Sequence, residues 1–316
     1  MSARSSSQSP PLWQVAVAFA AIYLIWGSTY LAIRFAIETI PPFSMGALRF
    51  LVAGGLVYAA ARTRAPRPSA RHWLSAVIAG TLLLGGGNGG VVWAEQWVPS
   101  GHAALIVATV PLWMVLLDWL FGSGRRPSSA LLMGLVWGLV GVGLLVSSNQ
   151  VGAQSRDGLL GGLSLCFASL SWAAGSIYSK GARLPESPWL ATGMQMLAGG
   201  VVLGILAMVA GEGARFHPSD FSFKSILALV YLIVFGALIA FTAYIWLLGV
   251  TTPARISTYA YVNPAVAVLL GWLLAEEHLD GRAALAMIII LSAVVVVSLR
   301  GGPRSPERVT HADHSN

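Results

Sequence analysis

Charged side chains are scarce in this sequence. Its 316 residues include 19 Lys or Arg and 12 Asp or Glu, so that 10% are charged, against about 25% in an ordinary soluble domain. A chain with 56% hydrophobic residues cannot cover a water-exposed surface with polar groups, which excludes a soluble enzyme. It is also too apolar for intrinsic disorder. A membrane protein that crosses the bilayer several times remains.

Residues that build metal or catalytic centres are few as well. The single cysteine, Cys166, excludes a disulfide framework and a zinc site of paired cysteines. The histidines do not cluster at metal-ligand spacing, and there is no H-E-x-x-H segment and no lysine-containing phosphate loop. A run at 85–90 spells G-x-G-x-x-G, but it lies in an apolar stretch without a preceding strand. We therefore expect no metal, no cofactor and no ATP-driven pump.

Long apolar runs, by contrast, are abundant. Ten runs of about 18 to 24 residues can each cross a hydrocarbon core of roughly 30 Å. They lie near 13–36, 43–61, 73–94, 100–121, 129–147, 159–179, 189–210, 225–248, 254–275 and 281–300. No segment shows the alternating polarity of a membrane β-strand. The sequence thus predicts an all-α polytopic protein with ten transmembrane helices.

The basic residues predict the orientation of these helices. With the N-terminus in the cytoplasm, 13 of the 19 Lys and Arg fall on the cytoplasmic side, four fall on the other side, and Arg34 and Arg49 lie within apolar runs. This bias follows the positive-inside rule and places both termini in the cytoplasm. Residues 1–12 and 301–316 are then cytoplasmic tails, the second of them disordered. The net charge of +7 marks cytoplasmic loops, so we expect no nucleic-acid partner.

The two halves of the chain look like copies of each other. A constant shift of 153 residues relates three anchors of the first half, Trp93, Pro111 and Trp119, to Trp246, Pro264 and Trp272. We predict two five-helix repeats over 13–148 and 158–300. Because five is odd, the second repeat enters the membrane upside down, and inverted repeats of this kind recur in secondary transporters that work by alternating access.

Four segments carry a family resemblance: WGSTYLAIRFA (26–36), PPFSMGALRFLVAGG (41–55), GNGGVVWAEQWVPSGHAALIVATVPLW (87–113) and TYAYVNPAVAVLLG (258–271). Together they resemble the EamA family of the drug/metabolite transporter superfamily, over nearly the whole chain. The resemblance implies a ten-helix bundle of two inverted repeats in the bacterial plasma (inner) membrane that exports or exchanges small metabolites. It specifies no substrate.

Polar and aromatic residues in the middle of apolar runs are candidates for a central cavity. Glycine and small polar residues lie in the segment from Trp26 to Tyr30 and in its counterpart from Trp172 to Ser176, in the middle of a run in each half. This favours such a cavity, although close helix packing is the alternative. The candidates for binding the solute are Trp26, Ser28, Thr29, Tyr30, Arg49, Asn88, Trp172, Ser176, Gln195, Tyr244, Tyr259, Tyr261 and Asn263. Hydroxyl, amide and aromatic groups with few charges suit a zwitterionic or amphipathic solute.

Two charged residues have competing interpretations. Arg49 lies about six residues inside the second run, where a charge is costly unless it faces protein or water. It either receives an anionic group of the substrate, forms a structural ion pair, or bonds helix-end carbonyls. Glu95, at the end of the third run, is either a gate charge or proton carrier or a solvated helix end. Arg34 lies nearer its helix end and favours anchoring at the interface.

Two prolines, Pro111 and Pro264, are expected to break their helices, because proline lacks a backbone donor and frees a carbonyl. Asn263 could bond the freed group. The leading hypothesis is a secondary transporter, not an enzyme, with a small-molecule solute and the lipid bilayer as its partners. An integral-membrane enzyme acting on a lipid and a passive facilitator or channel are the alternatives. The oligomeric state stays open, a monomer included.

Overall fold

The computed structural model describes residues 10–122, 129–146, 156–251, 256, 259–277 and 281–300. These residues are helical apart from short connections, and no strand occurs among them. The expected C-terminal tail lies outside the described residues, as do residues 1–9 of the N-terminal one. The all-α prediction is therefore confirmed for the described part of the chain.

Seven helical segments among the described residues are long and apolar enough to cross a membrane. They are Leu12–Ala36 (α1), Pro42–Arg62 (α2), Ala70–Ala94, Ser100–Phe121, Arg156–Gly181 (α8), Pro188–Val209 (α9) and Phe223–Val250. Helices also occupy the three other expected spans, as α7 (Ser129–Val146), α13 (Tyr259–Ala275) and α14 (Gly281–Arg300). Among the described residues, the apolar stretches of α13 and α14 are shorter and cover Val262–Ala275 and Ala284–Ala293.

The sequence sets several helix starts. Pro42 and Pro188 occupy the first turns of α2 and α9, where proline costs no hydrogen bond and its fixed φ suits the helix. The hydroxyl of Ser187 accepts a bond from the Leu190 N–H. Gly211 follows α9 with a φ of 69°, a conformation that glycine adopts without a Cβ clash.

The third helical segment of each half contains a stretch of wide, π-helical turns. In the first half, η1 (Thr81–Asn88) lies between α3 (Ala70–Gly80) and α4 (Gly89–Ala94). In the second half, η6 (Leu232–Phe241) lies between α10 (Phe223–Tyr231) and α11 (Thr242–Val250). Wide turns inside α-helices are rare and frequent at functional sites. Their corresponding places in the two halves point to a shared role.

Glycines bring α2 and α9 into close contact. A Cβ built on Gly54 would lie 2.7 Å from the Met196 Cβ and 2.8 Å from the Leu197 backbone nitrogen. A Cβ on Gly193 would lie 2.7 Å from the Tyr58 backbone nitrogen. Small residues at such crossings let two membrane helices pack backbone to backbone. The second helices of the two halves thus form a close junction between them.

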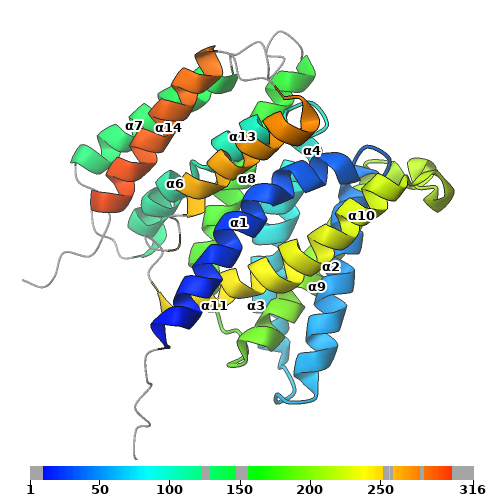
Figure 1. The fold of residues 1–316 in the computed structure, drawn as a ribbon. Helices are drawn as coiled ribbons and strands as arrows, with labels where there is room; N and C mark the ends of the chain where they lie inside the picture. The colour runs from blue at the N-terminus through cyan, green and yellow to red at the C-terminus, as the bar shows by residue number, and fades with distance from the viewer. Residues whose placement is uncertain are drawn as a thin grey trace, which may run out of the picture.

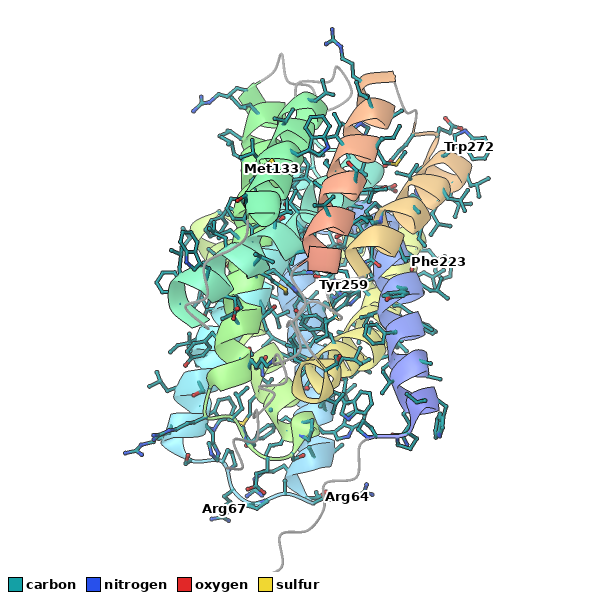
Figure 2. The ribbon with its side chains drawn as sticks, turned by 90° about the vertical axis from the view of Figure 1, so that its left-hand side faces the viewer. Arg64, Arg67, Met133, Phe223, Tyr259 and Trp272 are labelled. Atoms are coloured by element: carbon teal, nitrogen blue, oxygen red, sulfur yellow. The ribbon has the colours of Figure 1, made fainter. Side chains whose placement is uncertain are left out.

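The last helices of the two halves, α7 and α14, also pair, and they lie side by side along one edge of the bundle (Figure 1). A Cβ on Gly141 of α7 would lie 2.8 Å from side-chain atoms of Ile289 and Ile290. The outward surface is apolar: Met133, Phe223 and Trp272 are exposed and point away from the bundle (Figure 2). Such a belt of exposed apolar side chains suits contact with lipid rather than water.

Candidate functional site

A central cavity lies where the two halves meet. Its lining residues come from both halves: Trp26, Thr29, Tyr30, Ile33, Arg49, Phe50, Leu84, Gly87, Asn88, Val91, Val107, Ala168, Trp172, Gly236, Phe241, Tyr259 and Asn263. Tyr259 points into the interior of the bundle (Figure 2). Eight of the 13 residues proposed from the sequence to bind a solute line this cavity.

Aromatic rings form one wall of the cavity. The Trp26 ring meets those of Trp172 and Tyr259 edge to face, with 5.4 Å between ring centres in each pair. The ring centres of Trp172 and Phe241 lie 6.2 Å apart, and those of Phe241 and Phe50 lie 6.4 Å apart. Edge-to-face contacts hold rings in fixed orientations. The wall is therefore a preformed apolar surface rather than a set of loose side chains.

Arg49 supplies a positive charge to the same cavity. Its side chain is buried, and neither Nε nor Nη1 has a hydrogen-bond partner. The guanidinium carbon lies 4.7 Å from the centre of the Phe50 ring. A Cβ built on Gly236 would lie 2.6 Å from Nη2, so the glycine leaves room for the guanidinium group. A buried cation with free donors is costly, and an arriving anion would relieve that cost.

Each half contributes a tryptophan that packs on the wide turns of the other half. The Trp26 indole N–H donates to the Gly236 carbonyl in η6, with 3.3 Å between nitrogen and oxygen. The Trp172 ring lies against Gly87 in η1, where a Cβ would come within 3.0 Å of it. The cavity is therefore bounded by two contacts exchanged between the halves, a hydrogen bond from Trp26 and a packing contact of Trp172. This exchange fixes the position of one half relative to the other.

Two amides border the cavity. The Asn88 Oδ1 atom is buried without a hydrogen-bond partner, so it is a free acceptor facing the site. The Asn263 amide, with its nitrogen turned toward α1, lies 2.9 Å from the Tyr23 carbonyl oxygen and 3.2 Å from that of Ile22. Asn263 therefore ties α13 to α1, while Asn88 keeps polar capacity for a ligand.

Four of the proposed residues lie outside the lining. Ser28 turns toward α10, and its hydroxyl lies 2.6 Å from the Tyr231 hydroxyl. Ser176 and Tyr244 are 2.6 Å apart, oxygen to oxygen, and the Tyr244 hydroxyl accepts a bond from the Trp172 indole N–H. Ser176 and Tyr244 therefore hold the Trp172 ring in place from the side away from the cavity.

The fourth residue, Gln195 on α9, is buried, and neither amide atom has a hydrogen-bond partner. The side chain of Tyr261, another proposed residue, lies outside the described part of the structure.

Glu95, which follows α4, does not line the cavity, yet it is buried with both carboxylate oxygens lacking a hydrogen-bond partner. Burial and the charge of Glu277 raise the pKa of Glu95, against the opposing charges of Arg34 and Arg49. Arg34 is partly exposed and pairs with Glu277, with 3.7 Å between its Nε and Oε1. The environment of Glu95 is therefore not that of a solvated helix end.

The two prolines differ in their effect. The fourth segment is interrupted at Ala108 and Thr109, between α5 (Ser100–Val107) and α6 (Val110–Leu117), just before Pro111. Pro264, by contrast, lies inside the continuous helix α13, so the predicted break there is wrong. Gly27 allows α1 to lie directly against α13 beside Val266. Packed neighbours commonly let membrane helices run through a proline.

Carboxylates join the two halves at the end of the bundle where α1 finishes and α2 begins, which we name the capped end. Both oxygens of Glu212 accept from the start of α2, from the Phe43 and Ser44 N–H groups at 3.0 and 2.7 Å. Glu277 accepts in the same way from Ser100 and Gly101 at the start of α5, at 2.9 and 3.1 Å. Each carboxylate complements the positive end of a helix dipole.

Sequence reasoning missed Phe50, Phe241, Gly87 and Gly236, which line the cavity. Phenylalanine within an apolar run carries no signal of its own. The glycine-rich run at 85–90 is itself an unusual pattern in an apolar helix. Its match to a dinucleotide-binding pattern drew attention away from its role as part of η1.

Comparison with known proteins gives a consistent result. The profile of the EamA-like transporter family matches residues 13–147 and again 159–299. The uncharacterized inner membrane transporter YedA of Escherichia coli (strain K12) is 43% identical, over 88% of this chain and 89% of its own length. The uncharacterized transporter YoaV of Bacillus subtilis (strain 168) is 22% identical, over 89% of this chain and 95% of its own length. A protein crystal structure covering 92% of this chain and 98% of its own superposes with a TM-score of 0.62 at 23% identity, which supports the fold alone.

Proposed function

The chain belongs to the EamA-like transporter family, and on that premise we propose that it is a secondary carrier of the bacterial inner membrane that exports or exchanges small amphipathic metabolites. The central cavity carries the proposal. It lies between the two halves of the chain, and each half contributes to it a tryptophan and a stretch of wide turns. A site at the junction of two repeats is where alternating access places a substrate.

The proposed topology has ten spans in two inverted repeats, 13–148 and 158–300, with both termini in the cytoplasm. Arg64 and Arg67 lie together at the end of the bundle opposite the capped end (Figure 2), where the positive-inside rule places the cytoplasm. The capped end then faces outward. Glu95 remains the candidate proton carrier of this proposal, because it is a buried carboxyl beside Arg49.

The contacts at the capped end support an outward-closed conformation. Besides the two carboxylate caps, the Ser225 hydroxyl of the second half donates to the Phe35 carbonyl of the first at 2.8 Å. Near the opposite end, bonds such as that between Ser69 and His72 stay within one half. Outward opening would therefore have to break polar contacts between the halves.

We expect loss of the Glu277 cap to open the outer side. In a Cys166→Ser background, a cysteine replacing Ile33, which lines the cavity and is buried, reports access from outside. Glu277→Ala removes the acceptor for Ser100 and Gly101, and a charged hydrogen bond contributes about 1.5–3 kcal/mol. Labelling by a membrane-impermeant maleimide in right-side-out vesicles should rise about tenfold.

Glu38→Ala is the matched control, because it removes another outward-facing carboxylate of a cross-half pair, whose oxygen lies 2.6 Å from the Lys224 ammonium. Both side chains of that pair are about half exposed, and ion pairs at the surface contribute about 0–1 kcal/mol. Labelling should therefore stay near the parent value. Equal labelling in the two variants would contradict a specific role for the Glu277 cap.

Counterflow in proteoliposomes tests the carrier itself. Vesicles preloaded with a mixture of unlabelled metabolites should take up a labelled member of the mixture faster than empty vesicles, and uptake should saturate. A carrier gives this acceleration because a loaded site returns faster than an empty one. Uptake that is linear in concentration and unaffected by preloading would indicate a channel, and chemical conversion of an added lipid without flux would indicate an enzyme.

A further inference from the structure

The cavity has a charge and shape that narrow the chemistry of its ligand. Among the described residues that line it, Arg49 is the single charged side chain, and neither Asp nor Glu occurs. The guanidinium group lies beside Phe50, at one end of the chain of ring contacts that runs through Phe241 and Trp172 to Trp26. The site thus combines a positively charged hydrogen-bond donor with a wall of aromatic rings, and the Asn88 amide borders it as an acceptor.

We propose that the cavity binds monocarboxylates that carry an aromatic or similarly bulky apolar group, with the carboxylate on Arg49 and the apolar group on the ring wall. The inference rests on the proposed carrier function, whose substrate class it names. The sequence favoured a zwitterionic or amphipathic solute, and this proposal narrows that class to amphipathic solutes with one negative charge.

The free donors of Arg49 carry the first step of the argument. Nε and Nη1 are buried without partners, and a planar guanidinium group with two free donors matches the two oxygens of a carboxylate. The neighbouring protein groups do not fill this role: Glu95 forms no hydrogen bond with it, and the Gly236 carbonyl is bonded to Trp26. Glu95 thus acts on Arg49 through its charge alone, and the guanidinium group keeps two free hydrogen-bond donors for a solute.

The number of charges carries the second step. One buried cation balances one negative charge, whereas a dicarboxylate or a phosphate dianion would leave a second charge unpaired in an apolar site, at a cost of several kcal/mol. The ammonium group of an amino acid would likewise find no carboxylate in the described lining. Ring faces attract cations by about 0.5–2 kcal/mol, which is less than the cost of burying an ammonium.

The ring wall carries the third step. Trp26, Trp172 and Tyr259 meet edge to face, and the indole N–H groups of both tryptophans already have acceptors, the Gly236 carbonyl and the Tyr244 hydroxyl. The rings thus present carbon surface and little unsatisfied polarity. A flat apolar group can pack against them and displace water from that surface.

The test compares five small molecules that share a phenyl group and a short chain: 3-phenylpropionate, its neutral amide, phenylalanine, phenylsuccinate and 3-phenylpropylamine. Affinity for the purified full-length protein in lipid nanodiscs is measured at pH 7 by calorimetry. We expect 3-phenylpropionate to bind about 10- to 100-fold more tightly than the other four, as loss of a charged hydrogen-bonded pair predicts. Equal affinity for the amide, or tighter binding of phenylalanine or the amine, would overturn the proposal.

Variants assign the preference to Arg49. In Arg49→Gln the affinity for 3-phenylpropionate should fall to the affinity for the amide. The affinity for the amide should stay at its wild-type value, which shows that the cavity is intact. Arg49→Lys should retain part of the preference, because it keeps the charge but loses the two-pronged geometry. Arg62→Gln, the same change at the far end of α2, where the side chain bonds the Ala65 carbonyl, should leave the preference unchanged. A preference that survives in Arg49→Gln would overturn the assignment.

The outcome is separable from that of the carrier proposal. If the acid shows no preferential binding while another metabolite gives saturable counterflow, the substrate class is wrong and the carrier stands. If the acid binds through Arg49 but no solute undergoes counterflow, the binding site stands and the carrier is wrong.

Discussion

Gly54→Leu is expected to abolish the assembled protein. A Cβ at this position would lie 2.7 Å from the Met196 Cβ and 2.8 Å from the Leu197 backbone nitrogen, and a backbone atom in the middle of α9 cannot move aside as a side-chain end can. Overpacking a close junction costs about 3 kcal/mol or more. The yield of monodisperse protein on size-exclusion chromatography should therefore fall at least about tenfold.

The adjacent glycine provides the control. A Cβ on Gly55 would meet nothing within 4 Å, and leucine is a better helix former than glycine. Gly55→Leu should therefore give wild-type yield and an equal or higher melting temperature. Similar yields for the two variants would mean that α2 and α9 are not packed backbone to backbone.

Trp26→Ala is expected to lower the counterflow rate about tenfold or more, because the cavity wall loses a hydrogen bond and ring contacts that each contribute about 0.5–1.5 kcal/mol. The variant loses the bond to the Gly236 carbonyl and the contacts with the rings of Trp172 and Tyr259. Trp26→Phe keeps a ring but not the N–H donor, so its counterflow rate should lie between those of Trp26→Ala and the wild type.

Trp272→Ala controls for the general loss of an indole group, since Trp272 is 61% exposed on the outer surface (Figure 2). Its counterflow rate should match the wild type. A wild-type rate in Trp26→Ala, with the protein present at normal level, would mean that the contact between α1 and η6 plays no part in transport.

The positions of the membrane-spanning helices were predictable because each must bury about 20 apolar residues and the turns between them are short. The charge pattern also singled out Arg49, since an arginine inside an apolar run demands an explanation. Trp26 and Trp172 were found because they occupy corresponding places in the two halves. These signals are all local in sequence or repeat in it.

The remaining features depend on contacts between distant segments. The sequence around Glu277 resembles any polar turn, and its contact with Ser100 exists only because α13 ends beside the start of α5. Glu276, just before it, takes a φ of 53°, which turns the chain so that the Glu277 N–H bonds the Gly271 carbonyl. A non-glycine residue in this conformation is uncommon, and nothing in the sequence announces it.

The wide turns of η1 and η6 have a consequence for how the two halves could change shape. A π-helical turn holds about one residue more than an α-helical turn, and one residue corresponds to about 100° of rotation. If the surplus residue migrates by one turn, the side chains between its old and new positions swivel around the helix axis while both ends of the helix stay in place. A half could thus exchange the face it shows to the cavity within a single helix. Because η1 rests against Trp172 and η6 against Trp26, a shift of register in one half would be felt directly by a tryptophan of the other.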